Sequence, residues 1–467
     1  MDKRALISNA VTAFAAQGIG LLVAAIQSVL VPKVLGVEAY GYWQLFVFYI
    51  SYVGFFHLGL NDGVYLIKGG ESREEISKPS VNSQFLFSVG YQLVFAAVIV
   101  CLALAGLLGP DRSFIIACTG GYLVLHNAAA YLMFVLQAMN ETKKSSYATV
   151  VERLAYCLPL FALLGTGVLD FRPYVAAQLA AAAIQLLYCL YQMRDFPHAG
   201  LLTTSETLAE AAESIRVGLQ LMLAGIASQL ILGIARFAID WGWGVEVFGK
   251  LSLSITLANF FMVFVSQASM VLFPAMRQSE AGTMRRFVET AEALTSLAFP
   301  ILYVSYFPLV LILGTWLPAY AESLTFLAAL LPVCLFDCKT NLIYYTFYKV
   351  ERRERTMLLV NLVVAGSAAL ATWGATVLAH SYNIVILIAA IAIVSRSRYC
   401  SQTIARELDI TLGTLPYAEI VVAVAFTACC SALPLLPAFG LYLLVLGTYL
   451  VAYRKKARLA FRAIGRS

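Results

Sequence analysis

The sequence predicts an all-α, polytopic membrane protein. Of its 467 residues, 61% are hydrophobic and only 12% are charged, whereas a soluble protein carries about 25% charged residues. Apolar stretches of roughly 20 residues, long enough to cross a bilayer as a helix, recur along almost the whole chain. The alternating ten-residue segments of a membrane barrel do not occur, so the spans are predicted to be helices.

About fourteen spans are predicted by this length criterion, and only short polar segments separate most of them. The first run is longer than the roughly 7 to 15 apolar residues of a cleaved signal peptide, so it is predicted to be a span that is retained. The spans cover residues 6–31, 40–67, 82–108, 113–138, 147–168, 173–193, 215–238, 246–273, 288–313, 319–348, 357–379, 382–404, 412–432 and 437–453.

The distribution of lysine and arginine predicts the orientation. With the N-terminus in the cytoplasm, the inner loops collect most basic residues, among them Arg73, Lys143 and Arg353, and the tail 454–467 adds six more. This bias follows the positive-inside rule, so both termini are predicted to be cytoplasmic. The tail is expected to lie on anionic membrane lipid. The net charge of +6 therefore does not indicate nucleic acid as a partner.

An internal repeat predicts how the spans are grouped. The pattern Gly-Val-Glu-x-aromatic-Gly at residues 36–41 recurs 208 positions later at 244–249, and the same offset aligns Gly106 with Gly314 and Pro110 with Pro318. The offset spans an even number of crossings, so the halves are predicted to be parallel, as in transporters with two like lobes. Glu38 and Glu246 then both begin a helix, where the helix dipole favours a carboxylate.

The repeat predicts two six-helix lobes followed by two further helices. The first lobe is predicted at 1–193, a cytoplasmic linker at 194–214, the second lobe at 215–404, two C-terminal helices at 405–453 and the basic tail at 454–467. The linker contains Thr207 and Glu210 in a possible capping box, which predicts a short amphipathic helix. This anatomy indicates an alternating-access carrier with its binding site between the lobes.

Charged residues inside the spans are the candidate functional groups, because an ion at the bilayer centre costs at least ~2.5 to 3.5 kcal/mol. Cations suit an anionic ligand such as a phosphate or pyrophosphate headgroup, and isolated acids suit a coupling proton or sodium ion. The candidates for substrate binding are Arg236, Lys339, Arg153, Arg216 and Arg396. The candidates for the coupling ion are Asp62, Asp240 and Asp337.

Each candidate also has a structural interpretation. Arg153, Arg216 and Arg396 could extend to the cytoplasmic headgroups. Asp337 and Lys339 lie two residues apart, so they do not share a helical face, and each could pair with a different helix. Arg236 could pair with Asp240 four residues on, and Asp62 could cap a helix break made by neighbouring glycines.

The sequence predicts neither a cofactor nor a metal site. The nine cysteines include no Cys-x-x-Cys pair, so neither a disulfide framework nor a zinc site is expected. Paired carboxylates and nucleophile–base constellations are also missing. A membrane-embedded glycan polymerase or glycosyltransferase, the enzyme alternative, would need such residues and a sizeable outer loop for its acceptor. The chain is therefore predicted to be a transporter and not an enzyme.

The first two spans resemble those of bacterial polysaccharide-biosynthesis exporters, the lipid-linked oligosaccharide (O-antigen type) flippases of the multidrug/oligosaccharidyl-lipid/polysaccharide exporter superfamily. Pro32, the Leu-Gly at 35–36, the Tyr-Gly at 40–41 and the segment 58–63 match the pattern of that family. The stretch "ARFAIDWGWGVEVFGKLSLSITLANF" at 235–260 is similar to the equivalent part of the second lobe, with Asp240 before the turn.

The resemblance implies a flippase in the bacterial cytoplasmic (inner) membrane. It would carry an undecaprenyl-pyrophosphate-linked oligosaccharide outward for O-antigen, capsule or exopolysaccharide synthesis, with a proton or sodium gradient as the driving force. Its expected partners are this substrate, membrane lipids and other polysaccharide assembly proteins. A multidrug or small-metabolite exporter of the same superfamily is the alternative. A lipid II flippase would be expected to carry several arginines in the first two spans, where this chain has only Lys33 and Lys68 at the ends.

Overall fold

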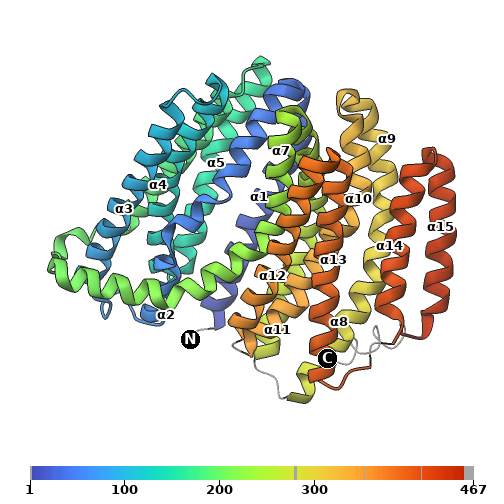
Figure 1. Ribbon diagram of the computed structural model, residues 1–467. Coiled ribbons are helices and arrows are strands. Elements are labelled where there is room, and N and C mark those ends of the chain that lie inside the picture. Colours follow the sequence, from blue (N-terminus) through green and yellow to red (C-terminus); the bar gives the residue numbers. More distant parts are fainter. Residues whose placement is uncertain (1–2, 278–280, 352, 412, 457–467) are drawn as a thin grey trace. The chain divides into compact units, whose positions relative to one another are not determined.

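The computed structural model describes residues 3–277, 281–351, 353–411 and 413–456, and every regular element in these ranges is helical (Figure 1). The chain forms two compact units, the first up to Ile226 and the second from Ala227. The predicted all-α class is therefore confirmed. Most of the predicted basic tail lies outside the described residues.

The first unit begins with a long helix that is broken at Gly36 and ends with the first part of α7. Short 3-10 segments join some of its helices. The elements are α1 (Lys3–Ile50), η1 (Val53–His57), α2 (Leu60–Lys68), α3 (Lys78–Leu104), α4 (Pro110–Ala138), α5 (Thr142–Thr166), α6 (Arg172–Gln192), η2 (Pro197–Ala199) and the start of α7 (Thr204–Arg277).

The second unit continues α7 through a break at Gly244 and contains two π-helical segments, η5 and η6. Its further elements are α8 (Ala281–Leu302), η3 (Tyr303–Ser305), α9 (Tyr306–Trp316), η4 (Pro318–Tyr320), α10 (Ala321–Lys339), η5 (Thr340–Tyr344), α11 (Tyr345–Val350), α12 (Glu354–Gly374), η6 (Ala375–Ala379), α13 (Tyr382–Glu407), α14 (Leu415–Ala432) and α15 (Leu435–Ala452).

The helices identify a multi-pass membrane protein. Ten of the described helical segments are long and apolar enough to cross a bilayer, and two bent helix pairs raise the number to twelve. Their outer faces carry large exposed apolar side chains, such as Leu158, Leu370 and Leu436, which are each more than three-quarters exposed and suit contact with lipid. The predicted count of fourteen stays a prediction.

The two copies of the Gly-Val-Glu-x-aromatic-Gly motif have the same backbone. Gly36 has φ 74° and ψ 179°, and Gly244 has φ 84° and ψ −179°, a conformation that favours glycine. The aromatic residues of the motif, Tyr40 and Phe248, are both fully buried. The repeat therefore marks the same bend in both units, with the aromatic side chain fixed in the core.

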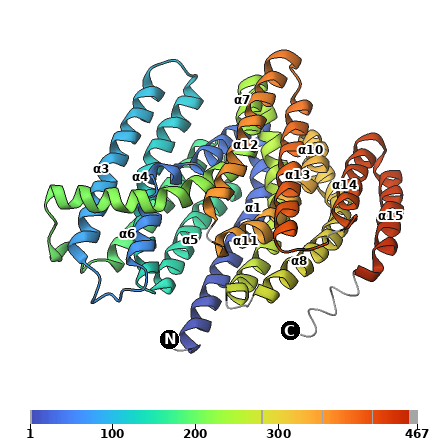
Figure 2. The ribbon, with the colours of Figure 1, turned by 60° about the horizontal axis from the view of Figure 1, so that its bottom comes forward.

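The first part of α7 packs on the first unit through small residues. A side chain at Gly63 would overlap the backbone of Ser214, and one at Gly218 would overlap the carbonyl oxygen of Gly59. The hydroxyl of Ser214 also donates a hydrogen bond to Oε1 of Gln84, 2.9 Å away. Figures 1 and 2 show this green segment lying across the helices of the first unit. Residues 204–226 therefore belong to the first compact unit. The predicted boundaries of the two six-helix lobes and of the linker at 194–214 stay predictions.

The capping box of this segment lies one turn before the predicted one. The backbone N–H of Thr203 donates to Oε2 of Glu206 at 2.9 Å, and the N–H of Glu206 donates to Oγ1 of Thr203 at 3.4 Å. These are the two reciprocal bonds of a capping box. The expectation for Thr207 and Glu210 was therefore wrong: Glu210 instead accepts hydrogen bonds from Ser80 and Gln84 on α3.

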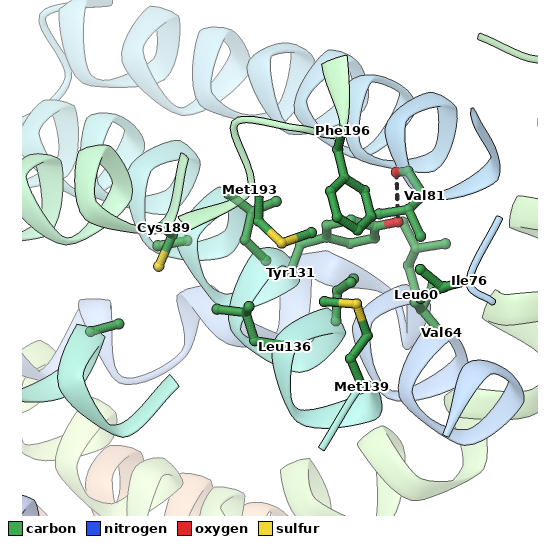
Figure 3. Packing of buried hydrophobic residues seen from close by; sticks show 14 of the residues in the cluster. Leu60, Val64, Ile76, Val81, Tyr131, Leu136, Met139, Cys189, Met193 and Phe196 are labelled. Atoms are coloured by element: carbon green, nitrogen blue, oxygen red, sulfur yellow. Dashed lines mark hydrogen bonds between the residues drawn. The ribbon is translucent and has the colours of Figure 1, made fainter. Parts of the chain in front are cut away.

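An apolar cluster holds the first unit together beside this contact (Figure 3). Tyr131 of α4 lies at its centre and donates its hydroxyl to the carbonyl oxygen of Val81 on α3, 2.9 Å away. Leu60 of α2 and Phe196 of the α6–α7 connection contribute to the same cluster. The hydrogen bond satisfies the one polar group of the tyrosine, so the whole side chain can be buried.

An ionic cluster joins three loops of the first unit. Arg73 of the α2–α3 loop pairs with Glu141 of the α4–α5 loop and with Asp195 after α6, both at 2.6 Å, and Lys78 pairs with Asp195 at 2.8 Å. Burial alone would raise the pKa of Glu141, but hydrogen bonds from Arg73 and Lys144 and the charges of these cations outweigh it and hold the pKa below its usual value. Burial would likewise raise the pKa of Asp195, but its hydrogen bonds and the charges of Lys78 and Arg73 outweigh burial and lower this pKa.

The close approach of α7 to α2 predicts the effect of a single methyl group. Gly63→Ala should destabilise the protein by about 1–3 kcal/mol or more, because backbone atoms would have to move apart. The midpoint of thermal unfolding in detergent measures this effect. Gly90→Ala is the matched control, since Gly90 is a helical glycine of α3 with open space around it; it should leave the midpoint unchanged or raise it slightly. Equal effects of the two substitutions would contradict the packing.

The ionic cluster predicts a loss of stability in acid. A carboxyl whose pKa is lower in the folded than in the unfolded chain stabilises the fold above the unfolded pKa, and this contribution is lost as the pH falls through the folded pKa. Free Glu and Asp carboxyls titrate near about pH 4. The destabilisation by Glu141→Gln should therefore be full at neutral pH and shrink below about pH 4. Glu74→Gln, at an exposed position of the α2–α3 loop next to Arg73, is the control. A pH-independent effect of Glu141→Gln would contradict the assignment.

Candidate functional site

A π-helical turn in the second unit directly follows residues of two ionic groups. Helix α10 ends at Lys339 and continues through the π-helix η5 into α11. Such turns occur frequently at functional sites. Asp337 and Lys339 lie just before this turn, and the side-chain amide of Asn341 donates to the carbonyl oxygen and to Oδ2 of Asp337, at 2.9 and 3.2 Å. Asp337 and Lys339 are two residues apart on α10, so their side chains point to different helices.

The first group is the ion pair of Arg396 on α13 with Asp337 on α10. Nη1 of Arg396 also donates to Oδ1 of Asn361 on α12 at 3.1 Å and to the hydroxyl of Ser228 on α7 at 3.2 Å. The Tyr345 hydroxyl donates to the same Asn361 oxygen. The Arg396 side chain is fully buried, while that of Asp337 is 27% exposed. The pair is therefore reachable from its carboxylate side.

The second group is the lysine triad, Lys339 with Glu292 on α8 and Glu419 on α14. Nζ of Lys339 lies 3.2 Å from Oε1 of Glu292 and 2.7 Å from Oε2 of Glu419, and the side chains are at most 3% exposed. Nζ also donates to the hydroxyl of Ser296 at 2.8 Å, which donates to Oε2 of Glu419 at the same distance. The triad is therefore a closed network between three helices.

The spacing argument for Asp337 and Lys339 agrees with the structure, since each side chain pairs with a different helix. Sequence analysis missed Glu292 and Glu419, although both lie inside predicted spans. A signal was present for Glu419, a single carboxylate at the start of the apolar run "IVVAVAF". A charged side chain inside the membrane costs free energy, and this criterion, which identified the other candidates, applies to Glu419 as well.

The candidates of the first unit lie on three different helices. Arg153 of α5 is half-buried beside Glu152, whose carboxylate accepts hydrogen bonds from the amides of Gln178 and Gln185 on α6, both at 3.3 Å. Asp62 lies in the first turn of α2, 3.6 Å from Nε2 of His57. Arg216 is exposed on the first part of α7. The part of α7 that carries Arg216 packs against α2 near Asp62, but the structure records no ion pair between the described candidates of this unit.

The remaining candidates, Arg236 and Asp240, lie on α7 close to the second copy of the motif. Nη2 of Arg236 donates to the hydroxyl of Ser252 at 3.1 Å, and its guanidinium lies 5.2 Å from the ring centre of Phe248. Asp240 is 5% exposed. Of the eight candidates, only Arg396 and Asp337 contact each other through an ion pair that the structure describes.

An apolar cavity lies between α10, α13 and α14. Its volume is about 400 Å³, and aliphatic side chains such as Val333, Ile386 and Val424 form most of its wall. This lining suits a hydrocarbon chain and not a charged headgroup. Among the described residues no cluster of three His, Cys, Asp or Glu side chains could hold a metal ion.

Comparisons with known proteins agree with this architecture. A family model described as "Polysaccharide biosynthesis protein" matches residues 6–280. No curated protein sequence matches the chain. Among solved structures, the chain is similar to the lipid II flippase MurJ in an inward closed conformation, with a TM-score of 0.68 at 12% identity, over 96% of this chain and 99% of that one.

A second similar structure is a MATE transporter from Vibrio cholerae, with a TM-score of 0.52 at 14% identity, over 89% of this chain and all of that one. At such identities the likeness concerns the fold alone. The chain therefore shares the fold of these two structures.

The lysine triad predicts a large loss of stability when its cation is removed. Lys339→Met should destabilise the protein by about 3–5 kcal/mol, because it leaves buried carboxylates without a counter-ion. Lys250→Met removes the cation of a more accessible pair with Glu322 at 2.9 Å and should cost at most about 1 kcal/mol. Thermal unfolding midpoints of both variants in detergent measure the difference; similar midpoints would show that the triad is not a buried ionic network.

Proposed function

The chain belongs to the polysaccharide biosynthesis protein family, and we propose that it is a flippase for an undecaprenyl-pyrophosphate-linked oligosaccharide. The observation that carries the proposal is that a chain of this family has a transporter fold over almost its entire length. Its place would be the bacterial cytoplasmic membrane, with both termini in the cytoplasm. The product would serve O-antigen, capsule or exopolysaccharide synthesis, in company with other polysaccharide assembly proteins.

The pair of Arg396 and Asp337 offers a way to couple an ion to the substrate. In the structure Asp337 neutralises Arg396. A proton or sodium ion on the accessible carboxylate of Asp337 would release the guanidinium, and a guanidinium suits a pyrophosphate better than an ammonium because it donates two parallel hydrogen bonds. Binding of the coupling ion to Asp337 would thereby favour binding of the pyrophosphate to Arg396, and binding of the pyrophosphate would favour binding of the ion.

Other parts of the chain supply further contacts in this proposal. The additional cations Arg153, Arg216, Arg236 and Lys339 are substrate contacts in other conformations of the transport cycle, and Asp62 and Asp240 are alternative positions for the coupling ion. The apolar cavity between α10, α13 and α14 offers a surface for the polyprenyl chain. A transporter fold with short connections between its spans also favours carriage over glycan polymerisation.

A deletion strain tests the substrate class. In a strain without a paralogue, loss of the gene should leave the lipid-linked glycan on the cytoplasmic leaflet and reduce surface polysaccharide. Immunodetection of surface glycan and analysis of extracted lipid-linked sugars measure both effects. Normal surface glycan together with sensitivity to toxic small molecules would instead support the multidrug exporter.

Complementation of that strain tests the ion pair. Asp337→Asn and Arg396→Gln should each lower export about tenfold or more, because losing a charge-assisted hydrogen bond costs about 1.5–3 kcal/mol. Arg353→Gln is the matched control, since Arg353 pairs with Glu407 at 2.8 Å with both side chains at least one-third exposed. Immunoblots of membranes verify equal protein levels. Wild-type export by both variants at equal levels would assign the pair to structure alone.

A further inference from the structure

The lysine triad contains one more acid than base. Lys339 is its only cation, and Glu292 and Glu419 both contact the ammonium group. All three side chains are almost completely buried. With both carboxylates ionised, the triad would bear a net negative charge in a region of low dielectric constant, which is strongly unfavourable. A proton on one of the two carboxyls makes the triad neutral.

The hydrogen bonds distinguish the two acids. Glu292 accepts hydrogen bonds at both oxygens: Tyr344 donates its hydroxyl to Oε2 at 2.6 Å, and Ser401 donates to Oε1 at 3.1 Å, where Lys339 also contacts it. This arrangement stabilises the ionised form. Glu419 receives Lys339 and Ser296 at Oε2 only. Its Oε1 is buried and has no hydrogen-bond partner among the described residues, which is costly for a carboxylate.

The other groups that face Glu419 are neutral. Around it lie the phenols of Tyr303 in η3, Tyr344 in η5 and Tyr449 on α15, which interact with it electrostatically. The Tyr303 hydroxyl is likewise buried without a partner in the described part of the chain. Tyr449 donates its hydroxyl to the carbonyl oxygen of Ser296, 2.8 Å away.

The nearest further cations are occupied elsewhere. Arg396 is neutralised by Asp337. The guanidinium of Arg398 on α13 lies 4.5 Å from the ring centre of Tyr417, which precedes Glu419 by two residues and so lies on a different face of α14. Lys339 is therefore the one cation that contacts both acids of the triad in the described structure.

We propose that Glu419 is a proton-binding site and carries the proton of the closed lysine triad. The step is a simple ionisation: the carboxyl of Glu419 releases a proton to water, and the charge of the triad changes from zero to −1. The ionised triad is stable only with water or a cation beside it, so proton loss favours separation of α14 from α8 and α10. The proton site does not depend on the substrate, whereas its part in coupling rests on the proposed function.

Infrared difference spectroscopy of the purified full-length protein in lipid nanodiscs tests the site near neutral pH. The C=O stretching band of a protonated carboxyl group is separate from the bands of a carboxylate. The spectrum of the wild type minus that of Glu419→Gln should contain a carboxyl band and no carboxylate bands. Glu292→Gln should also remove the carboxyl band, because Glu419 then becomes the sole counter-ion of Lys339 and ionises. Glu292→Gln should however lower the unfolding midpoint, since the ionised Glu419 has an unpartnered oxygen in the described structure, whereas Glu419→Gln should leave the midpoint near that of the wild type. Glu322→Gln changes an acid on α10, the helix of Lys339, that belongs to an accessible ion pair with Lys250, and it should remove carboxylate bands only.

Three results would overturn the proposal. These are loss of carboxylate bands alone in Glu419→Gln, an unfolding midpoint that Glu419→Gln lowers more than Glu292→Gln does, and failure of Glu419→Gln to fold, because glutamine reproduces the shape and neutrality of the protonated acid. The spectra need no substrate. A missing carboxyl band would thus disprove the proton site and leave the proposed flippase untouched, whereas a protein with this band that exports no glycan would disprove only the proposed function.

Discussion

A charge inside a membrane-spanning helix bundle is stable only if the bundle itself provides a counter-charge and hydrogen bonds, and the second unit is built around this constraint. Hydrocarbon lipid gives helices little reason to associate by apolar burial, so packing and polar contacts between helices become important. Lys339 connects α10 with α8 and α14, and Arg396 connects α13 with α10, α12 and α7. Because removal of one partner leaves the other unpaired, these contacts fix which helices are neighbours. In the proposed function, a change of charge by protons or ligands at these contacts would control the association of the helices.

The internal repeat supplies a common scaffold on which the two units differ chemically. Both copies of the motif bend at a glycine with positive φ and bury their aromatic residue, which explains why the pattern recurs without a gap. The polar interiors are different. Around Glu152 the first unit has glutamine amides and a neighbouring arginine, whereas the second unit has complete ion pairs. A function that requires two distinct ligands, an anionic lipid headgroup and a cation, is consistent with this division of chemistry.

Much of the fold follows from the apolar runs, but the site depends on tertiary contacts. Helices such as α4, α6 and α13 begin and end within a few residues of the predicted spans, because their lengths are set by a bilayer and their ends by polar residues. The two-residue spacing of Asp337 and Lys339 predicted divergent faces. Which residues they meet depends on helices distant in sequence, so Glu292 and Glu419 were not identified. Helix α7 begins at Thr204, one turn earlier than expected, so the capping box is formed by Thr203 and Glu206, and Glu210 contacts α3. The two π-helical turns have no marker in the sequence that we recognised.

Reconstitution provides the most direct test of the central claim that this protein moves a lipid-linked oligosaccharide across a membrane. Purified protein would be incorporated into liposomes that contain an undecaprenyl-pyrophosphate-linked oligosaccharide, and a membrane-impermeant glycan-cleaving enzyme would report how much substrate reaches the outer leaflet. The account predicts that the wild-type protein makes the inner-leaflet fraction accessible, at a rate that depends on an imposed proton or sodium gradient. Protein-free liposomes should retain that fraction. An inner-leaflet fraction that stays protected in the presence of well-folded protein, with either gradient, would contradict the account.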